Sequence, residues 1–321
     1  MRHYTLLHIA VLLAGFTGVL GKVITLNEGL LVWYRVLFTS ILLFLLQMLF
    51  IKDRRIPLRA QWEIVKVGLL ITAHWLFFYA SIKYSNVSIG VVCYCLTSFF
   101  TSIFKPLIDK KKIRLSELLL SILSVSGIGL IFHFDTGYRV GIALGIISAA
   151  LGALYTIFNA KIVQKYNNLT INYYQMLGGT IGWGLLLPVY LHFFPVEQLT
   201  PDLKDTFYLI LLSLFCTVGL YFALVEAMKK IPVFTINLSF NLEPIYAILL
   251  AFLFFNESKE VNFSFYIGLG IIIFAILLQE TPKNSKFKVL QGFLSAKLLS
   301  SKKIADQCNQ HTHTDPDVQR K

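Results

Sequence analysis

The feature that most constrains this chain is a succession of long apolar segments. An α-helix rises about 1.5 Å per residue, so about twenty residues cross the roughly 30 Å hydrocarbon core of a bilayer. Segments of this length follow one another through short links, at residues 4–25, 30–51, 63–83, 86–108, 114–133, 138–161, 170–194, 205–228, 232–255 and 262–279. We therefore predict an all-α integral membrane protein with about ten transmembrane helices.

The composition agrees with a lipid-facing exterior. Of the 321 residues, 56% are hydrophobic and 14% are charged, and the mean hydropathy is +0.68. A soluble domain of this size could not keep so much apolar surface away from water. The net charge of +12 would suggest nucleic acid in a soluble chain, but here the Lys and Arg residues lie mostly in short links and in the C-terminal tail. That placement predicts an anionic bilayer surface, not nucleic acid, as the partner.

The basic residues also predict an orientation. If the N-terminus is cytoplasmic, the cytoplasmic links include residues 52–59, 109–114 and 229–230, and each carries at least two Lys or Arg residues. The links on the opposite side carry no more than one each. Short cytoplasmic loops are enriched in Lys and Arg. We therefore predict a multi-pass protein of the cell membrane, the inner membrane in a bacterium, with both termini in the cytoplasm.

The two halves of the chain resemble each other. Residues 33–35 (WYR), near the start of the second segment, resemble residues 173–175 (YYQ), near the start of the seventh. Residues 82–84 (IKY) resemble residues 228–230 (MKK). The offset corresponds to five helices, an odd number, so the second copy is expected upside down in the membrane, as in known transporters. We predict two inverted five-helix repeats, at residues 1–136 and 137–281.

Residues 282–321 form a predicted basic cytoplasmic tail. Phe287, Leu290, Leu294 and Leu298 recur at near-helical spacing within it. This pattern is compatible with an amphipathic helix on the inner leaflet, and equally with a disordered solubilising tail. The end of the tail, from Asp306, is polar and is expected to be disordered.

A set of short motifs resembles a known family. Residues 241–247 (NLEPIYA) are followed by Asn256-Glu257 and then by Ile267-Gly268. In these motifs the chain resembles the EamA-type family of the drug/metabolite transporter superfamily. The resemblance covers about residues 5–280, and the first half contributes Gly18, Lys22, Arg35, Ala80, Lys83 and Tyr84. It implies a substrate pathway between the halves and, in many members, export of amino acids or related metabolites.

The first half departs from the family pattern at one informative place. Thr97-Ser98 stands where, 146 residues later, the second half has Glu243-Pro244. A proline frequent in the family is therefore missing from the first half. The two repeats are expected to contribute chemically unequal groups.

Glu243 is the strongest candidate for a substrate-pathway residue. It lies near the middle of a predicted span, where a carboxylate needs a partner, water or a proton. Pro244 is expected to kink the helix and to leave a carbonyl unpaired near Phe240. This arrangement suits a hydrated cavity. The alternative is an interhelical hydrogen bond that only holds the bundle together.

His74 and Arg35 are further candidates. His74 lies at a comparable depth in the third span and is able to relay a proton or to bind substrate, although a single buried histidine is often only a hydrogen-bonded core residue. Arg35 lies about one turn into the second span, where it would either bind an anionic group or extend to the membrane surface.

Other polar and aromatic residues complete the predicted pathway. Asn237 and Asn241 share one face of the ninth span, because residues four apart lie one above the other on a helix. The aromatic candidates flank His74 or lie deep in other spans, although each of them is also explained by packing: Trp75, Tyr79, Tyr94, Tyr221 and Tyr246.

These observations predict a transporter and not an enzyme, with a small-molecule substrate and no cofactor or metal. We find no ATP-binding, zinc-protease or serine-hydrolase motif in the sequence. We expect alternating access, driven by the substrate gradient or by protons, with export of amino acids implied by the resemblance. The alternatives are a nucleotide-sugar or sugar carrier, and a membrane-bound enzyme or receptor.

Overall fold

The computed structural model describes residues 2–50, 56–113, 118–119, 121–123, 126–127, 130, 136–255 and 263–280. The chain consists of two compact units, which meet between Ile276 and Leu277, and the helical bundle belongs to the first. The elements in order are α1 (Arg2–Val23), α2 (Glu28–Phe50), α3 (Leu58–Lys83), α4 (Val87–Tyr94), α5 (Leu96–Ile108), η1 (Thr136–Tyr138), α7 (Arg139–Ile162), α8 (Asn168–Phe193), α9 (Leu203–Ser213), η2 (Leu214–Gly219), α10 (Leu220–Met228), α11 (Val233–Ser239), η3 (Phe240–Leu242), α12 (Glu243–Phe255) and α13 (Phe263–Glu280), which runs into the second unit.

The prediction of an all-α membrane protein is confirmed. The described residues include eight helical spans long and apolar enough to cross a bilayer, and they contain no β-strand. These spans match eight of the ten predicted segments to within a few residues, except that α3 begins at Leu58. The tenth predicted segment corresponds to α13. The fifth, at 114–133, lies mostly outside the described residues, as does the whole tail at 282–321.

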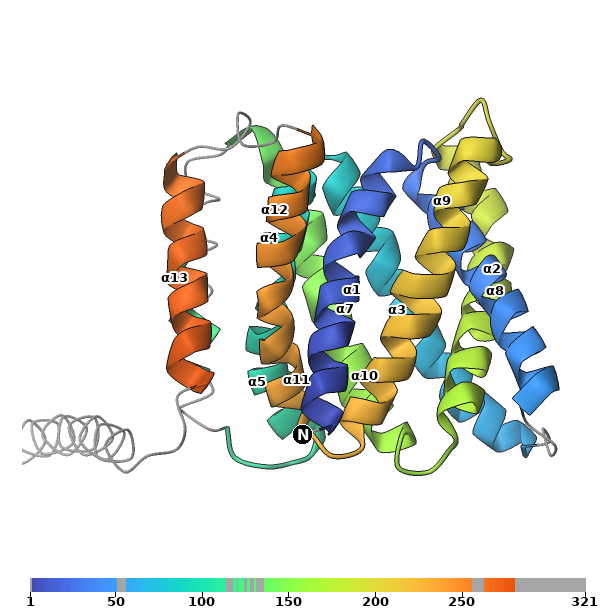
Figure 1. Cartoon of the computed structure of the whole chain (residues 1–321), viewed down its shortest axis with the longest axis horizontal. Coiled ribbons are helices and arrows are strands. Elements are labelled where there is room, and N and C mark those ends of the chain that lie inside the picture. Colours follow the sequence, from blue (N-terminus) through green and yellow to red (C-terminus); the bar gives the residue numbers. More distant parts are fainter. Residues whose placement is uncertain are drawn as a thin grey trace, which may run out of the picture. The chain divides into compact units, whose positions relative to one another are not determined.

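Several helix contacts between the halves occur twice, with the roles of the two halves exchanged. The contact of α3 with α7 corresponds to that of α10 with α1, and the contact of the α4–α5 pair with α7 corresponds to that of α12 with α1. The contact between α3 and α8 has its counterpart between α9 and α2. Figure 1 shows α1, from the first half of the chain, beside α12 from the second half. Most of the interhelical contacts therefore join the two halves of the chain to each other.

Two of the spans are broken at corresponding places. In the second half, the break is the 3₁₀ turn η3, which joins α11 to α12 just before Pro244. In the first half, the break separates α4 from α5 at Cys95, although no proline is nearby. There the Thr97 and Ser98 hydroxyl groups donate to the carbonyls of Tyr94 and Cys95, at 2.6 and 3.0 Å. Hydroxyl groups that donate to carbonyls of the preceding turn bend a helix. Thr97 and Ser98 therefore bend the span in the first half, as Pro244 does in the second.

The expectation of a free carbonyl at Phe240 was wrong. The carbonyl oxygen of Phe240 accepts a hydrogen bond from the backbone N–H of Glu243. A 3₁₀ turn pairs a donor with the carbonyl three residues earlier instead of four, so it re-satisfies a group that proline would otherwise leave open. The helix is interrupted as predicted, but its polar backbone remains paired at this point.

Small residues allow the halves to approach closely. A methyl group added at Gly145 on α7 would overlap the side chain of Cys93 on α4, and one added at Gly68 on α3 would overlap the carbonyl oxygen of Gln175 on α8. Close backbone contact of this kind is a main source of helix association in membranes. Cys93, Cys95 and Cys216 are buried and free, as expected of small apolar residues.

We predict that Gly68→Ala destabilises the bundle by about 1–3 kcal/mol, because the rigid backbone of Gln175 cannot move aside. Thermal unfolding in detergent measures the effect. The control is Gly270→Ala, at a helical position where no described residue lies within 4 Å of the added carbon. It is expected to be neutral or slightly stabilising, since alanine favours helix over glycine by up to about 1 kcal/mol. Equal melting temperatures for the two variants would contradict the packing argument.

Candidate functional site

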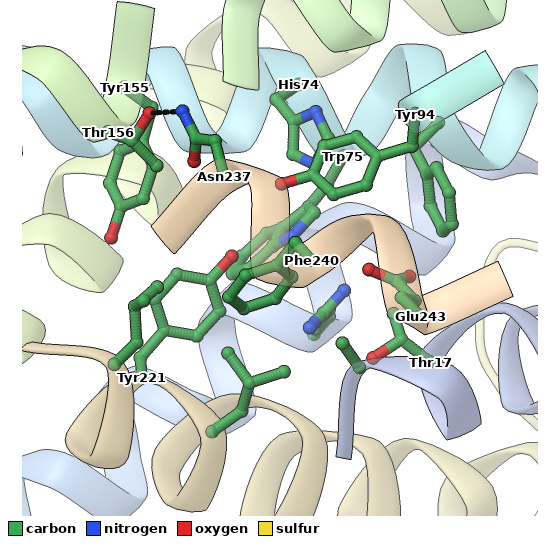
Figure 2. A pocket seen from close by; sticks show the side chains of 15 residues that line it. Thr17, His74, Trp75, Tyr94, Tyr155, Thr156, Tyr221, Asn237, Phe240 and Glu243 are labelled. Atoms are coloured by element: carbon green, nitrogen blue, oxygen red, sulfur yellow. Dashed lines mark hydrogen bonds between the residues drawn. The ribbon is translucent and has the colours of Figure 1, made fainter. Parts of the chain in front are cut away.

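A small cavity lies between the two halves of the chain. Its volume of about 40 Å³ is enough for water but not for a metabolite. In Figure 2, Glu243 and Thr17 lie at one side, Thr156 and Asn237 at the other, and aromatic rings lie between them. The lining residues are Ala14, Thr17, Arg35, His74, Trp75, Phe78, Tyr94, Tyr155, Thr156, Leu220, Tyr221, Leu224, Asn237, Phe240 and Glu243.

Arg35 is completely buried, with 0% of its surface exposed. Its Nε donates to Thr217 Oγ1 at 2.9 Å, and its two terminal nitrogens donate to Tyr79 Oη at 2.7 Å and to the Cys216 carbonyl oxygen at 3.0 Å. The guanidinium carbon also lies 3.8 Å from the ring centroid of Trp75. Arg35 therefore does not extend to the membrane surface but points into the bundle.

The Cys216 carbonyl is available to Arg35 because of a local irregularity. Residues Leu214–Gly219 form a π-helical turn between α9 and α10. The Thr217 hydroxyl donates to the carbonyl of Leu212, five residues earlier, at 2.9 Å. Such π turns shift the helical hydrogen-bond register and are frequent at functional sites. Here the π turn presents two acceptors to a single buried cation.

Glu243 begins α12 immediately after the 3₁₀ turn, and only 4% of it is exposed. It lines the same cavity as Arg35, yet the described residues contain no ion pair within 4 Å of its carboxylate. The cavity thus holds one cation and one acidic group that do not neutralise each other by direct contact. A carboxylate so placed is open to water, a proton or a cationic group.

His74 is anchored at one ring nitrogen. Its Nδ1 lies 2.9 Å from both the carbonyl oxygen and the Oγ of Ser148 on α7. Its ring lies beside that of Tyr94, with 5.1 Å between centroids and an angle of 40° between the ring planes. This anchoring gives His74 a role in joining α3 to α7, while its place in the lining leaves the rest of the ring beside the cavity.

Asn237 connects three helices at the far side of the cavity. Its Nδ2 donates to the hydroxyl oxygens of Thr101 on α5 and Thr156 on α7, both at 2.7 Å. The Asn237–Thr156 bond is drawn in Figure 2. Both bonds cross between helices, so the amide holds the broken span α11–α12 against its neighbours.

Seven of the ten predicted pathway residues line the cavity: Glu243, His74, Arg35, Asn237, Trp75, Tyr94 and Tyr221. The other three do not. Tyr79 lies behind Arg35 as its hydrogen-bond acceptor, and Asn241 donates to Ser98 Oγ at 3.3 Å. Tyr246 is 39% exposed and packs against Gly15 of α1.

Sequence reasoning missed several lining residues, chiefly Thr17, Phe78, Tyr155, Thr156 and Phe240. They belong to residue types that are common on buried helix faces, so nothing in their identity distinguishes them. Tyr155 and Thr156 do continue the helix that carries the small-residue stripe from Gly141 to Ala153. That stripe marks the close contact of α7 with α3 and α4, and all three of these helices contribute residues to the cavity.

Polar contacts join the two halves at two linkers, which lie at opposite ends of the bundle in Figure 1. At one end, the α1–α2 linker is held by Asp205 of α9, which accepts from Thr25 N at 2.9 Å and from Thr25 Oγ1 at 2.7 Å. At the other end, the α7–α8 linker is held by Glu63 of α3, which pairs with Lys165 Nζ at 2.6 Å and accepts from Tyr166 Oη at 3.1 Å. The cavity lies between these two contacts, which we name the closures.

Comparison with known proteins now places the chain. The model of the EamA-like transporter family matches residues 1–133 and again residues 139–279. The chain belongs to the EamA-like transporter family. The resemblance inferred from the motifs is thereby confirmed, and so is the general function of a membrane transporter.

Relatives of this EamA-like transporter agree with the assignment. An uncharacterized transporter of Haemophilus influenzae is 26% identical over 79% of this chain and 85% of its own length. An uncharacterized transporter of Clostridium kluyveri is 27% identical over 64% of this chain and 67% of its own length. A protein of known crystal structure superposes with a TM-score of 0.64 at 14% identity, covering 88% of this chain and 98% of the other, which shows a shared fold.

We predict that Tyr79→Phe destabilises the transporter by about 1.5–3 kcal/mol, because it leaves one charged Arg35 donor buried without its acceptor. Thermal unfolding in detergent provides the measurement. Tyr34→Phe is the matched control: its hydroxyl donates to the Leu199 carbonyl at 3.2 Å in an exposed setting. Removal of that bond is expected to cost about 0.5 kcal/mol or less. A Tyr79→Phe protein as stable as the control would show that Arg35 does not depend on this bond.

Proposed function

We propose that this transporter carries a small zwitterionic metabolite, of the amino-acid class, by alternating access between two inverted five-helix repeats at residues 1–136 and 137–281. One observation carries the proposal. A single cation, Arg35, and a single carboxylate, Glu243, line one buried cavity without pairing with each other. A zwitterion offers one partner to each.

Glu243 and the surrounding rings suit the ammonium group. A carboxylate attracts a primary or secondary ammonium directly, and aromatic faces add cation–π attraction that is strongest where water is excluded. Trp75, Tyr94 and Tyr221 supply such rings around the cavity. The Trp75 ring already contacts the Arg35 guanidinium, which leaves Tyr94 and Tyr221 for a ligand cation.

Arg35 suits the carboxylate group. A guanidinium has five N–H donors, and the described contacts to Thr217, Tyr79 and Cys216 use three of them. Donors are thus left for a substrate carboxylate. The counterpart of Arg35 in the second half is Gln175, which is neutral and bonds to Asn159 Oδ1 at 2.8 Å. The binding chemistry is therefore one-sided, although the framework is repeated.

The size of the cavity and its two closures support the proposal of alternating access. At about 40 Å³ the cavity must enlarge to admit a metabolite. Asp205 closes one end and Glu63 the other, and each contact joins the two repeats. Release of one closure while the other holds would expose the cavity to one side only, as alternating access requires.

Glu243 also offers a route for proton coupling. A carboxylate at this depth is stable when protonated or when paired with a substrate ammonium group. Competition between the two would exchange a proton for a substrate across the membrane. Export is the direction that the family resemblance favours.

A neutral sugar is the second candidate substrate. Stacked aromatic rings with amide and hydroxyl groups, such as Asn237 and Thr156, also suit sugar hydroxyl groups. A nucleotide-sugar fits less well, because its two phosphate charges would face Glu243 and a single Arg35. A sugar does not need both charged residues, and this distinguishes the two candidates in a flux assay.

In proteoliposomes, we expect flux of at least one amino acid that rises with an imposed pH gradient, and we expect Glu243→Gln to reduce it at least tenfold. The carboxylate is needed both for the ammonium group and for the proton. Glu226→Gln is the control, because Glu226 pairs with Lys229 outside the cavity. Monodisperse protein in detergent shows that each variant is folded. Unchanged flux of Glu243→Gln at every pH would contradict the proposal, and flux of sugars alone would favour the second candidate.

The two closures give a separate prediction. Asp205→Asn is expected to increase hydrogen–deuterium exchange at residues 24–27, because Thr25 loses charge-assisted bonds, and to leave residues 163–167 unchanged. Glu63→Gln should do the reverse. Each variant is the control for the other. An equal increase at both ends in either variant would indicate general unfolding and not a local closure.

A further inference from the structure

A second and larger cavity lies outside the substrate site. It is a groove of about 710 Å³ between α3 and α7, and it shares no lining residue with the central cavity. The lining residues of α3 follow one another at intervals of about one helical turn, so they share one face of that helix, and the same holds for the lining residues on and just after α7. The lining residues are Arg59, Trp62, Glu63, Lys66, Val67, Leu70, Phe158, Lys161, Ile162 and Lys165.

One part of the groove is strongly basic. Four cations line it against one carboxylate, Glu63, which Lys165 already engages at 2.6 Å. Lys161 lies 3.3 Å from Asp109 outside the groove. The pKa of the Asp109 carboxyl is lowered, mainly by its hydrogen bond with Lys105. For Arg59 and Lys66, the described residues provide no acidic group within ion-pair distance. The groove therefore retains positive charge that the described residues do not neutralise.

The rest of the groove is apolar. Val67, Leu70 and Phe158 form its walls farther along the two helices than the basic residues, and Ile162 lies between Lys161 and Lys165. Trp62 is 56% exposed, and tryptophan side chains of this kind gather at the level of lipid headgroups. Arg59 lies in the first turn of α3, at the same end of the bundle as the basic α7–α8 linker. The groove thus runs from a cationic mouth at the membrane surface to an apolar part deeper in the bundle.

We propose that this groove binds an anionic phospholipid, with the phosphate between Arg59, Lys66 and Lys161 and an acyl chain along Val67, Leu70 and Phe158. Basic pockets between transmembrane helices are a recognised setting for anionic headgroups. A free phosphate ion would use the cations but not the apolar walls. The lipid would bridge α3 of the first repeat and α7 of the second, next to the Glu63–Lys165 closure.

The test uses Trp62 as a reporter in reconstituted full-length protein. Phosphatidylglycerol brominated on its acyl chains quenches nearby tryptophans, and equally brominated phosphatidylcholine controls for the chain. The signal of Trp62 is the difference between the wild type and Trp62→Phe. We expect the ratio of the affinity for phosphatidylglycerol to that for phosphatidylcholine to be about five or more, which one Lys or Arg contact provides. Arg59→Gln with Lys66→Gln should reduce the ratio to about one.

The matched control is Lys110→Gln with Lys111→Gln, which removes the same charge from the exposed link after α5. This pair should keep the preference. Equal quenching by both lipids in the wild type would overturn the proposal, and so would an equal loss of preference in the control. Loss of the preference on addition of inorganic phosphate, at constant ionic strength, would assign the site to a soluble anion and also overturn it.

Discussion

The buried guanidinium of Arg35 is the constraint on which the rest of the site depends. Removing such a group from water costs several kcal/mol unless its donors are satisfied. Two elements meet that cost: α3 supplies Tyr79 and Trp75, and the π turn between α9 and α10 supplies Thr217 and the Cys216 carbonyl. Because α2 and α3 belong to the first half and the π turn to the second, one residue ties the two halves together at the cavity.

Interrupted helices make such a site possible within a membrane. A regular helix uses all of its backbone groups internally, so it has little to offer a ligand or a buried charge. Three of the described spans are irregular next to the cavity, at Cys95, at the π turn and at the 3₁₀ turn before Glu243. Each irregularity is supported by other groups, as the Thr97 hydroxyl supports the first break. The same spans therefore combine membrane stability with a polar centre.

The two halves share a framework but divide the chemistry. Breaks occur at equivalent places, and helix contacts exchange between the halves. Arg35 has the neutral Gln175 as its counterpart, and Thr97 stands where the other half has Glu243. The ends differ as well, because a neutral hydroxyl meets Asp205 at one closure and a lysine meets Glu63 at the other. A repeated scaffold with unequal groups gives the transporter distinct sides.

The sequence by itself determined the membrane class, the family and most of the spans, because hydrophobic length and backbone pairing leave few alternatives in a bilayer. It also identified Glu243, Arg35 and His74, since ionisable groups at that depth are costly and therefore informative. It did not distinguish Tyr221, which lines the cavity, from Tyr246, which faces outward. Only the tertiary structure decided such cases, because the irregular turns rotate side chains away from ideal helical positions. It also decided the partners of Arg35, because the contacts of Arg35 with Thr217 and Cys216 join residues more than 180 positions apart in the sequence.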